Sequence, residues 1–427
     1  MKRVIQPQDQ VFWYHQELPV APRVENVIVD VVIVGGGMAG LSAAQAFAAR
    51  GKKVAILEQF YCGSGASGKS SGFITPNAEL SLSDYERHYS LDAAKKIWNF
   101  IGSGVEDMRN NIIKHRLACD YLPQDTLVVA NSKSALKELK DEHDNLVKFG
   151  YQSVFYDESA IAEHINSKDY YGGVGYQNTF GINPFLYCQE MKRILQQQGV
   201  LIFEETPVLE IHDHSVNTVN GSVQAESIIV CVDRFMPNLG LLQKKVYHAQ
   251  TFLTVSQVLT DQQIKQIFPQ DNLMVWDTDL IYTYFRLAAN NRLVLGGGTL
   301  LSTYASHEYH DYARMTTKLQ TYFKKKFPQV NIHFVQQWPG LIGISKDMAP
   351  ITGRDKDRKH IYYITAATGL PIAAALGRYA AEHMVDGNTE LDDYFSPYRS
   401  FPIGSIFQTI LGTKISFALS NALTKYW

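Results

Sequence analysis

A strand–glycine–helix–strand pattern near the N-terminus constrains the fold of this chain more than any other feature. Val31–Val34 is a continuous apolar run, which is typical of a strand buried on both faces. Gly35, Gly37 and Gly40 follow at once with the spacing G-x-G-x-x-G, and an Ala-rich stretch of helical propensity comes next. A second apolar run covers 54–57. This order predicts a βαβ unit of a parallel sheet.

Each polar or glycine position of this unit has a physical role. Gly35 makes the tight turn, Gly37 lets the backbone approach a pyrophosphate, and Gly40 lets helix and strand pack closely. The helix N-terminus directs free N–H groups at the phosphates. Glu58 lies 18 positions after the last glycine. Its carboxylate would accept a hydrogen bond from a ribose 2′-OH and would repel a 2′-phosphate. The pattern therefore predicts a bound adenine dinucleotide without a 2′-phosphate; the alternative is a glycine-rich loop in an ordinary α/β domain.

Composition excludes several classes of protein. The 427 residues are 45% hydrophobic and 19% charged, enough for two domains and a large core. A net charge of −2 without a basic run argues against nucleic acid as a partner. The four cysteines are scattered without metal-ligand spacing, so we expect no metal site and buried thiols in a reducing compartment.

The two ends of the chain suggest where the protein resides. The first ten residues lack the apolar segment of a secretory signal, and no window holds 18 uncharged apolar residues, so we expect a cytoplasmic protein. Apolar residues recur at helical spacing through 406–427, with Lys414, Lys425 and Trp427 beside them. This tail is interpreted either as a terminal helix packed on its own core or as an interfacial helix in peripheral contact with a membrane.

Hydrophobic periodicity and turn residues give the expected order of elements. Helices are predicted over 84–117, 132–149, 157–166, 183–199, 311–327 and 370–385. Strands are predicted over 122–129, 200–203, 208–212, 222–225, 227–232, 246–258, 273–276, 280–287, 292–296 and 360–365. A second strand–glycine–helix unit near the end of the chain indicates a discontinuous domain. The predicted fold class is α/β: a Rossmann-like domain with a parallel sheet and an inserted α+β, mainly antiparallel substrate domain.

The expected domain boundaries follow from this order. The chain is expected to consist of an N-terminal arm (1–29), a discontinuous cofactor domain (30–85, 151–235 and 345–400), a substrate domain (86–150 and 236–344) and an amphipathic tail (401–427). The arm contains Pro7, Pro19 and Pro22 and an aromatic cluster, Phe12-Trp13-Tyr14, which we expect to pack across the body of the protein.

Several motifs together resemble a known family. They are Val31-Val-Ile-Val-Gly-Gly-Gly-Met-Ala-Gly-Leu-Ser, Gly65-Ala-Ser-Gly-Lys-Ser-Ser-Gly, Cys119-Asp-Tyr, Asn183-Pro184, Tyr284-Phe-Arg-Leu, Asn291-Arg-Leu-Val-Leu-Gly-Gly-Gly and Ile361-Tyr-Tyr-Ile. Over nearly its whole length the chain resembles the flavin-dependent amine oxidase family that includes D-amino-acid oxidase, glycine oxidase and sarcosine oxidase. Within this family it is similar to the bacterial gamma-glutamylputrescine oxidoreductases.

The resemblance implies that the dinucleotide is FAD. The loop 64–72 would pass the pyrophosphate, Val208 would contact the adenine side, and the Thr368-Gly369 turn would direct a helix N-terminus at the flavin pyrimidine edge, where it would stabilise negative charge. The residues expected to hold FAD are Gly35, Gly37, Met38, Ala39, Gly40, Glu58, Gln59, Ser64, Ala66, Ser67, Gly68, Ser70, Ser71, Val208, Thr368, Gly369, Leu370 and Pro371.

Three departures from the family pattern lie at positions that the family places near flavin or substrate. Close relatives have Gly-Arg-Asn-Gly-Gly where this chain has Gly68-Lys-Ser-Ser-Gly72, and Ser-Gly-His-Gly where it has Thr368-Gly-Leu-Pro371. Ile342 stands where amino-acid oxidases of the family carry an arginine that grips the substrate carboxylate. We therefore expect a substrate other than a simple α-amino acid held at that position.

The candidate catalytic residues are Tyr284, Arg286, Lys346 and Trp338. Tyr284 and Arg286 alternate with Tyr282, so they share one face of a strand, where they could offer hydroxyl donors and a cationic anchor. The alternative is that the tyrosines are core residues and that Arg286 is a structural partner. His248, Tyr85 and His88 are weaker candidates.

The expected activity is FAD-dependent oxidation of the CH–NH group of a small-molecule amine: a secondary amine, a polyamine conjugate or an amino-acid derivative. Hydride would pass to flavin N5, the imine would be hydrolysed, and oxygen or another electron acceptor would reoxidise the cofactor. Two alternatives stay open: an FAD-binding partner or maturation subunit without amine oxidase activity, and a flavin oxidase of another substrate class.

Overall fold

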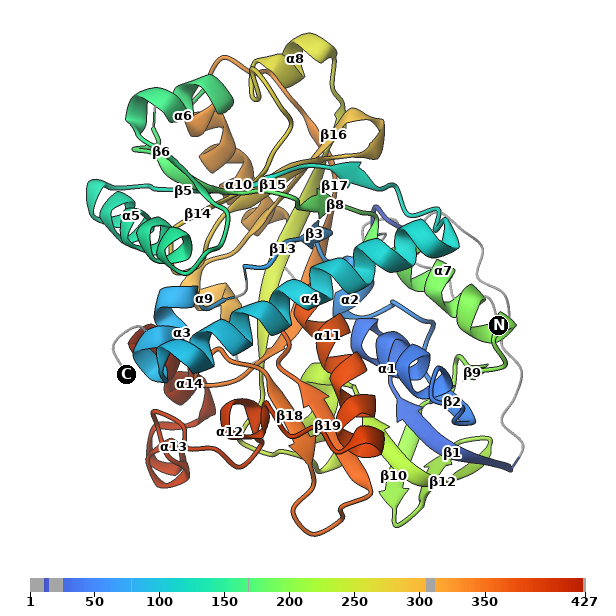
Figure 1. Cartoon of the computed structure of the whole chain (residues 1–427). Coiled ribbons are helices and arrows are strands. Elements are labelled where there is room, and N and C mark those ends of the chain that lie inside the picture. Colours follow the sequence, from blue (N-terminus) through green and yellow to red (C-terminus); the bar gives the residue numbers. More distant parts are fainter. Residues whose placement is uncertain (1–10, 15–25, 78, 168, 305–311, 425–427) are drawn as a thin grey trace.

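The chain folds around two large β-sheets with helices on their outer faces (Figure 1). The computed structural model describes residues 11–14, 26–77, 79–167, 169–304 and 312–424. Most of the N-terminal arm, including its three prolines, therefore lies outside the described residues. Within the described part, Val11 and Trp13 are buried against the body of the protein.

The first sheet is the predicted parallel sheet. Strand β1 (Val27–Val34) pairs in parallel with β2 (Val54–Leu57) on one side and β12 (Gly221–Val230) on the other. Strand β9 (Leu201–Phe203) extends the sheet beyond β2, and β19 (Ile361–Thr365) pairs in parallel with the carboxyl-terminal part of β12. The two expected strands 222–225 and 227–232 form the single strand β12.

Both faces of this sheet are buried, as its apolar strands require. On one face, Val31 and Ile33 pack against helices α1 (Met38–Ala48), α11 (Leu370–Ala381) and α4 (Leu91–His115). Helix α1 packs against α11, and α11 packs in turn against α4 (Figure 1). A β-carbon on Gly377 of α11 would lie 2.3 Å from the carbonyl oxygen of Ala39, so glycine permits this close approach. Because α4 packs on α11, we propose that α4 belongs with the cofactor domain and not with the rest of 86–150.

The second sheet is antiparallel except where β14 pairs with β5. Its strands, in spatial order, are β17 (Phe334–Ile344), β13 (Tyr247–Val258), β16 (Arg292–Gly297), β15 (Tyr284–Ala288), β14 (Met274–Asp277), β5 (Thr126–Val129), β7 (Gly173–Tyr176) and β6 (Val154–Tyr156). Because β6 and β7 lie in this sheet, 151–235 does not belong wholly to the cofactor domain. With these two changes, the division into a cofactor and a substrate domain stays our proposal.

The remaining elements complete the layers. The other strands are β3 (Phe73–Ile74), β4 (Leu122–Pro123), β8 (Phe180–Gly181), β10 (Val208–His212), β11 (Ser215–Thr218) and β18 (Ile351–Arg354). The other helices are α2 (Ala66–Lys69), α3 (Leu82–His88), α5 (Lys133–Lys148), α6 (Glu158–His164), α7 (Pro184–Gln197), η2 (Asp233–Leu239), α8 (Asp261–Lys265), η3 (Ala289–Asn291), α9 (Leu300–Thr303), α10 (Tyr312–Lys326), η4 (Glu382–Asp386) and α12 (Asp392–Phe395). The prediction of an α/β fold with a parallel sheet and a mainly antiparallel second sheet is confirmed.

The C-terminal tail forms two helices where one was expected. Helix α13 (Ser405–Leu411) ends at Gly412, whose φ of 77° breaks the helix, and α14 (Thr413–Leu423) follows. Helix α14 buries Phe417 against Tyr247. The end of the predicted tail, 425–427, lies outside the described residues.

Candidate active site

A cavity of about 1280 Å³ lies between the two sheets, and both contribute to its walls. It begins at the carboxyl end of β1 and continues past β13 and β17 to the aromatic side chains of β14 and β15. Small-molecule pockets usually measure about 300–1,000 Å³. The cavity is therefore large enough for a dinucleotide together with a second, smaller molecule.

The glycine turn forms one end of the cavity. Gly35 has a φ of 107°, and a β-carbon there would lie 2.5 Å from the carbonyl oxygen of Cys231. A β-carbon on Gly40 would lie 1.9 Å from the carbonyl oxygen of Gly35. Gly37 is the N-cap of α1 and has no side chain with which to cap it; the Met38 N–H donates to the Ser67 hydroxyl. The first turn of α1 can thus direct N–H groups at a phosphate.

Glu58 closes the turn from the neighbouring strand. Its carboxylate accepts hydrogen bonds from the Gly36 N–H at 2.8 Å and from the Phe60 N–H at 3.0 Å. Burial raises the pKa of Glu58, although these two hydrogen bonds oppose the rise. Glu58 lines the cavity, where its carboxylate could reach a ribose hydroxyl. That contact stays a prediction.

The loop 64–72 runs along the cavity, and three side chains hold its backbone from behind. The Nε1 of Trp338 donates to the Lys69 carbonyl at 2.9 Å, and the Nε1 of Trp13 donates to the Ser70 carbonyl at 2.9 Å. The Nε of Arg286 donates to the Ser71 carbonyl at 2.6 Å. Three consecutive carbonyl groups are therefore fixed by side chains from the N-terminal arm, β15 and β17.

This arrangement corrects the expected roles of Arg286 and Trp338. Both are almost fully buried, and neither lines the cavity. The guanidinium of Arg286 also donates to the carbonyl groups of Ile182 and Leu287, and burial lowers its pKa to about 9, so it stays charged at neutral pH. These two side chains hold the loop from behind, and neither faces the cavity.

Lys346 and the weaker candidates also lie outside the cavity wall. The ammonium group of Lys346 donates to the Ile403 carbonyl at 2.7 Å, which ties the segment after β17 to the chain before α13. His248 stacks on Tyr247, and Tyr85 and His88 belong to α3. None of these four predicted residues lines the cavity of the described structure.

The cavity wall contains most of the residues expected to hold FAD. They are Gly35, Gly37, Met38, Ala39, Glu58, Gln59, Ser64, Ala66, Ser67, Ser70, Ser71, Val208, Thr368, Gly369, Leu370 and Pro371. Gly40 and Gly68 are set behind this wall, where they allow close backbone packing; a β-carbon on Gly68 would lie 2.1 Å from the Gly63 carbonyl oxygen.

A second helix N-terminus meets the cavity opposite the glycine turn. Gly369 has a φ of 114° and caps α11 without a side-chain hydrogen bond. Sequence reasoning missed Asp233, which supports this turn: its carboxylate accepts hydrogen bonds from the N–H groups of Gly343 at 2.6 Å and Ala366 at 3.1 Å. Asp233 follows the carboxyl end of β12, the place where α/β sheets carry ligand sites, and that signal could have identified it.

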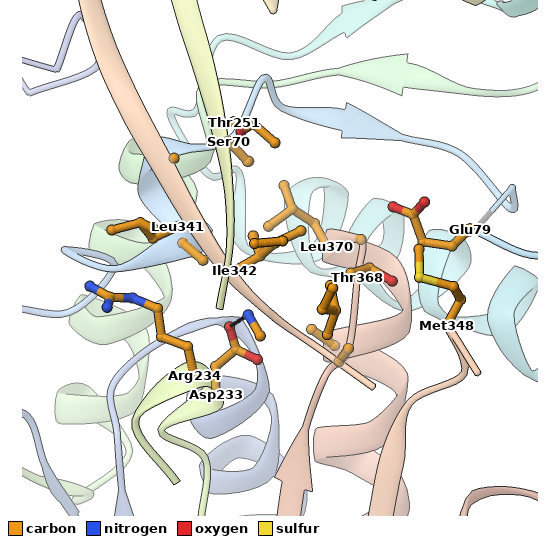
Figure 2. Close-up of a pocket in the computed structure, with 18 of the residues that line it drawn as sticks. Ser70, Glu79, Asp233, Arg234, Thr251, Leu341, Ile342, Met348, Thr368 and Leu370 are labelled. Carbon is orange, nitrogen blue, oxygen red and sulfur yellow. Dashed lines mark hydrogen bonds between the residues drawn. The ribbon is translucent and has the colours of Figure 1, made fainter. Parts of the chain in front are cut away.

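The far end of the cavity is aromatic, and the Glu79 carboxylate lies beside its tyrosines. Figure 2 shows Glu79 across the cavity from Asp233 and Arg234, close to Met348. The Tyr282 hydroxyl donates to the Glu79 carboxylate at 2.9 Å, and the Tyr282 and Tyr284 rings lie 5.8 Å apart. Burial raises the pKa of Tyr284 to about 12, so this phenol stays a donor at neutral pH. Nothing in the local sequence pattern singles out Glu79.

Glycine spacing and strand pairing explain how this aromatic end is built. A β-carbon on Gly296 of β16 would lie 2.3 Å from the ring of Tyr284, so glycine leaves room for the ring. The ring of Trp276 stacks 5.8 Å from Phe73 and lies 6.2 Å from Tyr282. All four aromatic side chains line the cavity.

These features define a dinucleotide-dependent oxidoreductase: a glycine turn, two helix N-termini with glycine N-caps and an adjoining aromatic chamber share one cavity. Residues 30–383 match the family model described as FAD dependent oxidoreductase, and the chain belongs to this family. The cofactor is FAD, and the glycine turn, Glu58 and the loop 64–72 provide a cradle of suitable size and chemistry.

Known proteins support the family assignment. The chain is 26% identical to a probable oxidoreductase OrdL of Haemophilus influenzae, over 96% of each chain. It is 27% identical to the gamma-glutamylputrescine oxidoreductase of Escherichia coli, over 89% of each chain. Among solved structures, glycine oxidase from Geobacillus kaustophilus has a similar fold, with a TM-score of 0.74 and 17% identity over 89% of this chain and all of that one.

Proposed function

We propose that the chain oxidises the CH–NH group of an amine that carries a second cationic group, such as a polyamine or a polyamine conjugate. FAD supplies the hydride acceptor, and water then hydrolyses the imine to a carbonyl compound and an amine. Oxygen or another acceptor removes the electrons afterwards. The relative from Escherichia coli, named for gamma-glutamylputrescine, supports an amine of this kind.

The observation that carries the proposal is the position of Glu79 at the aromatic end of the cavity. Of the described residues, Tyr282 alone is a hydrogen-bond partner of its carboxylate. An ammonium group would gain a charge-assisted hydrogen bond from Glu79 and favourable contact with the aromatic rings. Ile342, which Figure 2 shows at the cavity, offers no charge to a substrate carboxylate.

The charges along the described cavity wall support a cationic substrate. The basic residues of this wall are Lys69, Arg87 and Arg234. Arg87 forms an ion pair with Asp84, and Arg234 lies 4.1 Å over the ring of Phe235, on the side of the cavity opposite Glu79 (Figure 2). The acidic residues of this wall are Glu58, Glu79, Asp84, Glu138, Asp141, Glu142, Asp233, Asp277 and Asp279. Such a wall favours amines over carboxylates.

The protein residues have separate tasks in this proposal. Glu79 holds the distal ammonium group, while the aromatic walls exclude water and leave the reacting nitrogen in its neutral form. Tyr284 is the hydroxyl best placed to orient that nitrogen, because it lines the cavity beside Tyr282. The N-terminus of α11 would stabilise negative charge that develops on the cofactor.

The test is anaerobic mixing of the purified holoenzyme with diamines, polyamine conjugates, monoamines, sarcosine and α-amino acids. Diamines should bleach the flavin absorbance most readily. Glu79→Gln should raise the half-saturating diamine concentration by about 10–100-fold, the value of one charge-assisted hydrogen bond. Asp141→Asn, an exposed acid on the same wall, is the matched control and should change it less than threefold.

Two outcomes would contradict the proposal. If α-amino acids bleach the flavin as well as diamines do and Glu79→Gln has no effect, the substrate is not selected by this carboxylate. If dithionite reduces the flavin but no amine does, the chain is an FAD-binding protein of another role, and attention moves to Lys69–Ser71 and Leu370–Pro371.

A further inference from the structure

The two C-terminal helices present an apolar face to solvent. Ile406 and Ile410 of α13 are each 76% exposed, and Ile415, Leu419 and Leu423 of α14 are about half exposed. Phe407 and Leu411 of α13 are also exposed, so large exposed apolar side chains recur along both helices. A concentrated apolar surface of this kind is a mark of an interaction site.

Helix α14 is fixed to the protein by the side that carries Phe417 and Asn421, so its exposed apolar side chains do not belong to an unfinished core. Phe417 is fully buried, and the side-chain amide of Asn421 donates to the carbonyl groups of Ser345 and Lys346 at 2.9 Å. Tyr304 donates to the Asn421 carbonyl oxygen at 2.9 Å. Turning the apolar face inward would break this buried set of hydrogen bonds.

The charge of the tail indicates what covers the face. After Asp393 the sequence contains no acidic residue, whereas Lys414 and Lys425 are basic; Arg399 is buried in an ion pair with Asp347 and adds no free charge. Lys244 adds a further ammonium group beside α13, 3.5 Å from the Thr409 hydroxyl. Protein interfaces favour aromatic residues, Met and Arg, whereas this face is mainly Ile and Leu, with Phe407 as its one exposed aromatic side chain among the described residues of the two helices. Apolar side chains with basic residues beside them are typical of helices that lie in the headgroup region of anionic membranes.

We propose that the α13–α14 face binds the surface of a bilayer containing anionic lipids. Within the described chain, no helix is long and apolar enough to cross a membrane, so the contact is peripheral. Asn421 and Thr424 of the same segment also line the cavity. Binding would therefore place one wall of the active site close to the lipid surface. This inference is independent of the proposed substrate.

The test is co-sedimentation of the full-length holoenzyme with phosphatidylcholine vesicles, with and without phosphatidylglycerol. The protein should sediment with the anionic vesicles and be released by salt. Ile406→Gln/Ile410→Gln should weaken partitioning by roughly tenfold or more, because two exposed apolar side chains lose their burial in lipid. Ile113→Gln/Val147→Gln removes two helical side chains of similar exposure elsewhere and should leave partitioning unchanged.

Circular dichroism and the flavin spectrum show whether each variant is folded, and light scattering gives its mass in solution. Equal amounts of wild-type protein in the supernatant with and without anionic vesicles would overturn the proposal. So would a dimer in solution that Ile406→Gln/Ile410→Gln converts to monomer, because the face would then bind a second copy of the chain.

Discussion

Replacing Arg286 by methionine tests whether this side chain positions the flavin loop or binds substrate. Methionine fills similar space but donates no hydrogen bond. The substitution leaves three backbone carbonyl groups without the buried guanidinium: those of Ser71, Ile182 and Leu287. The Gln124 side-chain oxygen, 3.4 Å from Nη1, loses a partner as well.

The size of the effect follows from these contacts. A hydrogen bond to a buried charged group contributes about 1.5–3 kcal/mol, and removing the buried charge itself returns part of that loss. Arg286→Met should therefore lower the free energy of unfolding by about 3 kcal/mol. Because Ser70 and Ser71 line the cavity, the freed loop should also bind FAD about tenfold more weakly, equivalent to about 1.4 kcal/mol.

Urea unfolding of the apoprotein measures the first quantity, and titration of FAD by its fluorescence measures the second. The control is Arg193→Met, because Arg193 is an exposed member of an ion pair on α7 and should contribute less than about 1 kcal/mol. An unchanged unfolding midpoint and FAD affinity in Arg286→Met, with a higher KM for the amine, would refute the positioning role and restore Arg286 as a substrate anchor.

Three further predictions follow from contacts elsewhere. Gly40→Ala should abolish FAD binding, because its β-carbon would lie 1.9 Å from a backbone oxygen of the turn, whereas Gly102→Ala, with open space around it, should retain the flavin spectrum. Lys192→Met should lower the free energy of unfolding, measured with urea, by about 3–5 kcal/mol, because it leaves the buried Glu204 carboxylate without its ion-pair partner. Adding Glu204→Gln should restore much of that free energy, and no restoration would contradict a charge effect. Burial raises the pKa of Glu79, so diamine affinity should fall as the pH decreases through that raised pKa, and Glu79→Gln should remove this dependence from the pH profile of kcat/KM.

The nucleotide-binding half of the fold could be predicted because its signals are local. A strand buried on both faces is apolar at every position, and the turn that follows it admits only glycine at Gly40, where a β-carbon would meet backbone. Neither requirement depends on distant parts of the chain. The predictions of the α/β class and of FAD depend on these local signals, and both are confirmed.

Elements defined by their neighbours were harder to predict. Strand β17 contains Pro339 and two glycines, which weaken the strand pattern, yet it pairs along its length with β13. Strands β6 and β7 have no local mark that assigns them to the second sheet. The break between α3 and α4 depends on Ser90, whose hydroxyl accepts the Ala93 N–H, within a stretch that otherwise looks helical throughout.

The candidate site likewise contains residues that the local sequence pattern identifies and residues that it does not. Period-2 alternation places Tyr282, Tyr284 and Arg286 on one side of the chain, and the two tyrosines do line the cavity. Alternation cannot say how far along the strand the cavity extends, and Arg286 lies beyond it, under the loop. Glu79 could not be found from the sequence, because it faces the cavity only through the tertiary path of the segment after β3.

The way the loop is held would let its side chains vary while its backbone keeps one shape. Trp338, Trp13 and Arg286 bind the carbonyl groups of three consecutive residues, and a carbonyl is present whatever the side chain. Lys69–Ser71 can therefore vary without moving the backbone, and the variation changes only the chemistry that the loop offers to the cavity. Substitutions in the three donors should consequently alter FAD affinity, whereas substitutions within the loop should alter substrate preference and the rate of flavin reduction.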